Sequence, residues 1–275
     1  NNPRGFSVDG IDYSELSPRE YQRVLAGITA PNYEPMEGWL AVGRGRKPWT
    51  ICVRHESSLD KKEVIDCQTM YSTANFGHGN ENILDAVLGY VRNIWAPTGN
   101  GITNHMQLPA FTALREVTGL DARIITKSGG GEAIDTALKI ARRFWWARHG
   151  KPSESFLKQN SKIVVAYGAF HGRPLGATSL FEINDSSRKG FGPFPDTTIW
   201  VPFNDSDAIK TVFHEHKTNI VGVLLEPVQG EGGIIVPDDD YLPRVQELCH
   251  KYGALFMLDE VQTGFGRTGK NFAFE

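Results

Sequence analysis

The stretch Ala254-Leu255-Phe256-Met257-Leu258-Asp259-Glu260-Val261-Gln262 carries most of the fold information in this chain. Five apolar residues lead into two carboxylates, and a glycine-rich loop at 264–269 follows. A continuous apolar run that ends in turn residues predicts a strand buried on both faces, as in a parallel sheet. Open α/β sheets bind ligands beyond the carboxyl ends of such strands. Because a buried carboxylate needs a partner, we expect Asp259 to face a cation.

The composition is that of an ordinary globular chain. It has 275 residues, 40% of them apolar, and a formal net charge of −3 with both signs interspersed, which gives no footprint for nucleic acid or an anionic membrane. Three widely spaced cysteines provide no disulfide or zinc framework. No apolar run reaches membrane-spanning length, and the first residues are not a signal peptide. We therefore expect a cytoplasmic location, with the mitochondrial matrix as the alternative.

The sequence pattern changes near residue 71. Residues 1–71 contain one helical pattern and three short strand-like pieces, typical of an N-terminal segment with antiparallel strands. In residues 72–275, amphipathic helices alternate with apolar strands, which predicts an α/β fold with a mostly parallel sheet flanked by helices. In this second region we expect strands at 122–126, 162–166, 198–201, 220–225 and 254–258, and helices at 82–95, 110–118, 132–149 and 241–252.

Polar groups gather where the expected strands end. Ser128-Gly-Gly-Gly-Glu132 lies between a strand and a helix start, where free N–H groups and the helix dipole favour a phosphate; a simple flexible turn is the alternative. Phe170-His171-Gly172-Arg173 follows the strand at 162–166 and offers a stacking ring and an anion clamp, although Phe170 alone would more often be a core residue. Because parallel strands end at one edge, we expect these groups to form a crevice.

Two nucleotide-binding patterns and one metal pattern are incomplete. Residues 264–270 fit G-x-G-x-x-G and G-x-x-x-x-G-K, but no helical pattern opens there, and Asn271 stands where a P-loop needs Ser or Thr. His214-Glu215-His216 is not H-E-x-x-H, and the eight histidines are scattered. We expect no metal site.

Pyridoxal 5'-phosphate meets the requirements of the expected crevice. Its phosphate suits the glycine turn, its ring suits an aromatic neighbour, and its pyridinium nitrogen suits a buried carboxylate. An Asp at that nitrogen keeps the ring protonated, so that the ring can accept electrons from a substrate carbanion.

From about Tyr33 to Glu275 the chain resembles the class III aminotransferases, the ornithine, acetylornithine and 4-aminobutyrate group of fold-type I pyridoxal phosphate enzymes. The resemblance rests on the motifs at 71–79, 128–132, 170–173, 225–231 and 258–264. It implies the large domain of a fold-type I enzyme in residues 72–275, incomplete in this chain. The implied cofactor-binding residues are Gly130, Gly131, Phe170, His171, Asp259, Val261 and Gln262.

The resemblance also implies individual roles. Asp259, the catalytic residue of this chain, pairs with the pyridine nitrogen, and Gln262 reaches the ring hydroxyl. Gly130 and Gly131 hold the phosphate, while Phe170 and Val261 cover opposite faces of the ring. The implied substrate-binding residues are Tyr33 and Tyr71, which shape the pocket, Arg173, which binds the α-carboxylate, and Glu231, which pairs with an active-site arginine and switches between substrates.

This chain departs from the family pattern in two respects. Gly131 and Pro174 replace bulkier or hydroxyl residues that are common there. The Schiff-base lysine is absent, because the family carries it on a later strand, and Lys270 follows Asp259 too closely (270 − 259 = 11 positions) to serve. We expect the remaining C-terminal portion in a longer polypeptide or a second chain. A homodimer is also expected, because this fold builds its sites at a subunit interface.

The implied activity is transamination of an ω-amino or basic amino acid, ornithine or acetylornithine, with 2-oxoglutarate as acceptor. The alternatives are another class III reaction, such as racemisation or dialkylglycine decarboxylation, and a remnant that binds the cofactor without transaminating. The chain alone is expected to be inactive without the downstream lysine.

Overall fold

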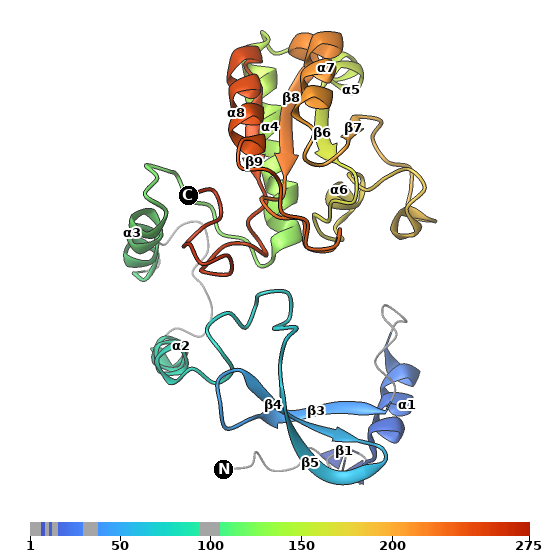
Figure 1. Ribbon diagram of the computed structural model, residues 1–275, viewed down its shortest axis with the longest axis vertical. Coiled ribbons are helices and arrows are strands. Elements are labelled where there is room, and N and C mark those ends of the chain that lie inside the picture. The colour runs from blue at the N-terminus through green and yellow to red at the C-terminus, as the bar shows by residue number, and fades with distance from the viewer. Residues whose placement is uncertain (1–6, 9–10, 13–15, 30–37, 94–104) are drawn as a thin grey trace. The chain divides into compact units, whose positions relative to one another are not determined.

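The computed structural model describes residues 7–8, 11–12, 16–29, 38–93 and 105–275 (Figure 1). The chain divides into two units, Asn1–Asn104 and His105–Glu275. This division falls later in the chain than the change of sequence pattern at residue 71. Within the described residues, no helix combines the length and the apolar character needed to cross a bilayer.

The N-terminal unit contains an antiparallel three-stranded sheet; its first two strands lie where the sequence predicted them, whereas the third, expected at 64–67, begins six residues earlier. β3 (Trp39–Arg44), β4 (Thr50–His55) and β5 (Ser58–Ile65) form an antiparallel sheet in that order. The other elements of this unit are the two-stranded pair β1 (Ser7–Val8) and β2 (Ile11–Asp12), and the helices α1 (Pro18–Ile28) and α2 (Glu81–Asn93).

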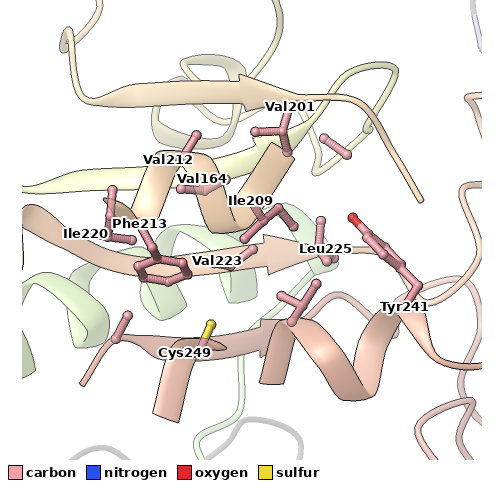
Figure 2. Packing of buried hydrophobic residues seen from close by; sticks show 13 residues of the cluster. Val164, Val201, Ile209, Val212, Phe213, Ile220, Val223, Leu225, Tyr241 and Cys249 are labelled. Carbon is pink, nitrogen blue, oxygen red and sulfur yellow. The ribbon is translucent and has the colours of Figure 1, made fainter. Parts of the chain in front are cut away.

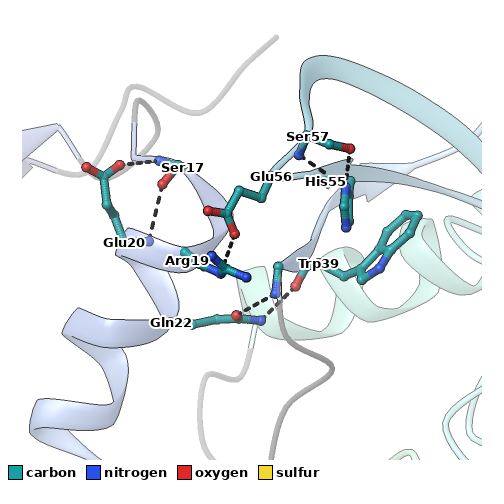
Figure 3. A network of polar contacts seen from close by, with 9 residues as sticks. Ser17, Arg19, Glu20, Gln22, Trp39, His55, Glu56 and Ser57 are labelled. Carbon is teal, nitrogen blue, oxygen red and sulfur yellow. Dashed lines mark hydrogen bonds and ion pairs between the residues drawn. The ribbon is translucent and has the colours of Figure 1, made fainter.

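A capping box begins α1 (Figure 3). The Ser17 hydroxyl accepts a hydrogen bond from the Glu20 backbone N–H at 3.3 Å, and the Glu20 carboxylate accepts one from the Ser17 N–H at 2.9 Å. These bonds from Ser17 lower the pKa of Glu20. One turn later, the Gln22 carboxamide bonds to the Gly38 N–H and the Trp39 carbonyl, which fixes the helix to the start of β3.

The C-terminal unit is built on a four-stranded parallel sheet, as the sequence predicted. Its order is β7 (Thr198–Val201), β6 (Lys162–Ala166), β8 (Ile220–Leu225) and β9 (Leu255–Leu258). The prediction of a strand at 122–126 is wrong. This apolar run forms no ladder with any described residue, and the side chain of Ile125 is 60% exposed.

Helices cover both faces of this sheet. α4 (Gly130–Arg148) and α6 (Leu175–Thr178) pack on one face, and α7 (Ser206–His216) and α8 (Tyr241–Tyr252) pack on the other. Alternate residues of β6 enter different layers, so Val164 packs with α7 and α8 whereas Val165 packs with α4. The remaining elements are α3 (Gln107–Thr118), α5 (Glu154–Asn160) and two 3₁₀ turns at Ser186–Arg188 and Lys217–Asn219.

The α7–α8 layer is the larger of the two cores (Figure 2). Phe213 of α7 lies over Ile220 and Val223 of β8, and Cys249 of α8 closes the layer beside them. Burial raises the pKa of the Cys249 thiol to about 12, so this cysteine remains protonated and serves as a small apolar core residue.

β8 and β9 differ in burial. Every residue of β8 is buried, as expected for a strand between two neighbours with helices on both faces. All four residues of β9 are only half-buried, because β9 is the edge strand and its only described ladder is with β8. Both faces of β9 are covered, since Phe256 and Leu258 pack on the α7–α8 layer and Leu255 and Met257 on the α4 layer, but the predicted full burial is wrong.

Replacing Ile209 tests the core described above. Ile209 on α7 is fully buried, so Ile209→Ala is expected to lower the free energy of unfolding by about 2–5 kcal/mol. Ile140 on α4 is 52% exposed, so Ile140→Ala is the matched control, with a change within about 0.5 kcal/mol. Urea unfolding monitored by circular dichroism measures both; equal losses would contradict the assigned core.

Candidate active site

The candidate site lies at the carboxyl ends of three parallel strands, where an aromatic and three ionisable side chains follow them. Phe170 and His171 follow β6, Glu226 follows β8, and Asp259 follows β9. His171, Glu226 and Asp259 are 3%, 6% and 7% exposed, respectively. The position is the one that parallel α/β sheets use for ligands.

The central contact of this site joins His171 to Asp259. Nδ1 of His171 lies 2.8 Å from Oδ2 of Asp259, and the other carboxylate oxygen accepts a hydrogen bond from the Val261 N–H at 3.1 Å. Nε2 of His171 is buried and has no hydrogen-bond partner among the described residues. The sequence had placed both residues in the site without predicting their pairing. The signal was available, because both follow strands that end at one edge.

Glu226 connects two of the loops that surround this pair. Its carboxylate accepts hydrogen bonds from the Phe170 N–H at 3.1 Å and the Gly230 N–H at 3.2 Å. Burial raises the pKa of Glu226 above its usual value, partly offset by these two bonds. The motif at 225–231 contains this residue, but the resemblance assigned it no role; the structure shows that Glu226 fixes the backbone of two loops beside the site.

The glycine turn at the start of α4 lies against two other segments of the site. A Cβ at Gly130 would lie 2.7 Å from Cγ1 of Val261, and a Cβ at Gly131 would lie 2.5 Å from Cδ of Pro174. Both distances are too short for real side-chain carbons, so only glycine permits this approach. Gly131 and Pro174, the two residues that depart from the family pattern, therefore complement each other: the proline ring occupies the space that a side chain at position 131 would need.

A cavity of about 300 Å³ brings three of the predicted residues together. Phe170, Arg173 and Glu231 all line it. The Arg173 guanidinium carbon lies 5.5 Å from the ring centroid of Phe170 and 5.9 Å from that of Phe181. Glu182 and Asp185 line the cavity too, so one guanidinium and three carboxylates surround it, which suits a ligand that carries an ammonium group as well as a carboxylate.

The remaining predicted residues occupy different places. Gln262 lies beside Gly230, where any larger residue would overlap its carboxamide. Tyr71 belongs to the N-terminal unit, where it is 54% exposed within a run of four positive-φ residues at 69–72. Tyr33 lies outside the described residues.

The described residues fit pyridoxal phosphate. The glycine turn opens α4 with backbone N–H groups, Phe170 offers a ring, and the buried Asp259 carboxylate has an imidazole partner that has one nitrogen still unpaired. No group of three or more His, Cys, Asp or Glu side chains arranged to hold a metal ion occurs in the part of the chain that the structure describes.

Comparison with known proteins assigns the family. The aminotransferase class-III family model matches residues 54–275, so the chain belongs to the class III aminotransferases, which are pyridoxal phosphate enzymes. It is 34% identical over 264 residues to the mitochondrial ornithine aminotransferase of Arabidopsis thaliana, covering 94% of this chain and 52% of that protein. It is 37% identical over 214 residues to the acetylornithine aminotransferase of Bacillus cereus, covering 78% of this chain and 50% of that protein.

Solved structures agree with the fold. The ornithine aminotransferase of Toxoplasma gondii, whose active site holds pyridoxal phosphate at partial occupancy, superposes with a TM-score of 0.81 at 26% identity over 94% of this chain and 57% of its own. The acetylornithine aminotransferase of Elizabethkingia anophelis superposes with a TM-score of 0.74 at 30% identity, covering 94% of this chain and 59% of its own. The chain thus spans about half the length of the curated relatives it matches.

The contact between Gly131 and Pro174 predicts a coupled pair of substitutions. Gly131→Ala alone is expected to destabilise the chain by about 1–3 kcal/mol, because the new methyl group overlaps the proline ring. Adding Pro174→Ala is expected to recover at least half of that loss. Urea unfolding of the two single variants and the double variant measures the coupling.

Gly129→Ala is the control for this cycle, because a Cβ at Gly129 meets nothing within 4 Å and the backbone there is extended. Its cost is expected to stay below about 1 kcal/mol. Strictly additive losses in the double variant would show that Gly131 and Pro174 do not share one space.

Proposed function

We propose that this chain forms the cofactor-binding part of an aminotransferase that acts on ornithine or acetylornithine, with 2-oxoglutarate as the acceptor. The buried contact between His171 and Asp259, at the sheet edge beside the Gly130–Val261 contact, carries the proposal. Relatives named as ornithine and acetylornithine aminotransferases support the choice of substrate.

In this proposal the cofactor supplies an electron-accepting ring that stabilises negative charge at the substrate Cα. Asp259 holds a proton at the ring nitrogen. An ionised carboxylate only accepts hydrogen bonds, so His171 donates to it through Nδ1 and keeps it in place. Phe170 and Val261 cover the two faces of the ring, and Gln262 bonds to its hydroxyl.

The other proposed residues bind phosphate and substrate. The N–H groups of Gly130 and Gly131 bind the phosphate at the positive end of α4. Arg173 binds the substrate carboxylate, and Glu231, one of three carboxylates that line the same cavity, discriminates between amino donor and acceptor. Tyr71 and Tyr33 complete the substrate pocket.

The intact enzyme, in this proposal, is a homodimer of the cytoplasm or the mitochondrial matrix. The Schiff-base lysine comes from the portion of the relatives' length that this chain does not span, in the same polypeptide or in another. That lysine would move the proton between Cα and the cofactor.

Replacing Asp259 in the intact polypeptide tests the central role. Asp259→Ala is expected to lower kcat for glutamate formation from ornithine or acetylornithine and 2-oxoglutarate at least about 100-fold, because the ring nitrogen loses its charged partner. Asp239→Ala, an exposed acid elsewhere in the same unit, serves as the control and is expected to retain full turnover. Unchanged turnover in Asp259→Ala would contradict the proposal.

Two other class III reactions define the alternative outcome of this assay. Stereoinversion of an amino acid without keto-acid formation would identify a racemase. Release of CO₂ from a dialkylglycine would identify a decarboxylase. Either result, without amino transfer to 2-oxoglutarate, would replace the proposed activity while leaving the cofactor site in place.

The chain alone provides a second prediction. Incubated with pyridoxal phosphate and then borohydride, the 275-residue chain is expected to acquire no covalently fixed pyridoxyl group at a single lysine, as read by peptide mass spectrometry. A stoichiometric label at Lys270 would show that the glycine loop supplies the missing amine. The intact polypeptide, labelled at its downstream lysine, is the positive control.

A further inference from the structure

A second cleft, of about 590 Å³, lies near the amino ends of β6 and β7, whereas the candidate active site lies at the carboxyl ends of the strands. α4 lines it with Lys139, Arg142, Arg143 and Trp146, whose spacing of i, i+3, i+4 and i+7 places them on one face of the helix. Across from them lies α5. The floor includes Thr197, the residue immediately before β7.

This cleft is separate from the candidate active site. Ser161, which lines the cleft, immediately precedes β6, whereas Phe170 and His171 follow the other end of that strand. Five residues of extended chain span on the order of 15 Å. Among the described residues, no side chain that lines this cleft also lines the cavity around Arg173.

The cleft carries a large excess of positive charge. Four cationic side chains line it, opposed by the single carboxylate of Glu154: Lys139, Arg142, Arg143 and Lys158. None of the four forms an ion pair within the described part of the chain. Like charges held together repel, so an anion of more than one charge would stabilise this arrangement.

Arg142 and Arg143 are already held in place. Nη2 of Arg142 donates a hydrogen bond to the buried Thr197 hydroxyl at 2.9 Å. The Arg143 guanidinium lies 4.2 Å from the ring centroid of Trp146, and that indole donates to the Pro152 carbonyl at 3.0 Å. Less rotational freedom is therefore lost when these groups bind a ligand.

Arg142 has an unmet hydrogen bond. Its Nε is buried, with no acceptor among the described residues, and burial lowers the pKa of its guanidinium. A buried charged donor without an acceptor is costly, so this guanidinium gains more than an exposed one from an anion bound to the part of it that lines the cleft.

We propose that the cleft between α4 and α5 is a binding site for a small phosphate-bearing anion. A phosphate group offers several acceptor oxygens around one centre, which suits the two guanidinium forks and the two lysine ammonium groups that converge there. The site does not depend on the proposed transamination.

The test is isothermal titration of the whole chain with inorganic pyrophosphate at constant ionic strength. Arg142→Gln is expected to weaken binding at least about tenfold, since a charge-assisted hydrogen bond contributes enough for one decade of affinity. Arg142→Lys keeps the charge but loses the planar guanidinium, so its affinity is expected to lie between those of the unchanged chain and Arg142→Gln. Arg148→Gln removes a cation from α4 beside Phe144, outside the cleft, and is the matched control with unchanged affinity.

Three further measurements keep the test decisive. Lys158→Gln, at an exposed position on α5, is expected to weaken binding about threefold and guards against misfolding of the Arg142 variants. Gly131→Ala distinguishes the cleft from the glycine turn. If Gly131→Ala lowered the affinity for pyrophosphate and Arg142→Gln did not, the proposal would be overturned. Citrate bound as tightly as pyrophosphate, or equal weakening in Arg148→Gln and Arg142→Gln, would overturn it as well.

Discussion

The hydrogen bond between His171 and Asp259 is the constraint on which the candidate active site depends. The two residues follow β6 and β9, which are separated in the sheet by β8, so the contact exists only when all three strands are in register. In a buried environment such a polar pair is stabilising when each group has a partner and costly when one is lost. Glu226, which follows the intervening strand, fixes the neighbouring loops through two backbone N–H groups.

The helix α4 links this site to the rest of the unit. Its first residues form the glycine turn that lies against Val261 and Pro174, and its buried stripe packs on β6 and β8. Its second half presents the basic face that lines the second cleft. One helix thus contributes to both proposed anion sites, with its glycine-rich start at the carboxyl ends of the strands and its basic face near their amino ends.

Much of this fold follows from local patterns. The bounds expected for β6, β7, β8 and α8 match the structure, because each apolar run or stripe is bounded by turn residues or glycine. The errors at 122–126 and at β9 have a different origin. Whether an apolar run forms a strand, and how deeply it is buried, depends on neighbouring strands that its own residues do not specify.

For the candidate active site, the sequence predicted which kinds of side chain are present but not how they contact one another. The sequence identified the kinds of side chain at the strand ends, since strand topology alone brings Phe170, His171 and Asp259 to one edge. It did not predict the imidazole–carboxylate pairing, the structural role of Glu226, or the match between Gly131 and Pro174. These depend on distances between segments far apart in the chain, for which a single sequence has no local signal.

The half-buried strand β9 has a practical consequence. Its outer edge presents backbone N–H and C=O groups that have no described ladder partner, while its side chains pack against the two cores. Such an edge is a template for the addition of another strand, and proteins normally blunt it with charge or proline. The outer side of β9 is therefore the place in this unit where a further strand, from the same polypeptide or from another, could add to the sheet in register.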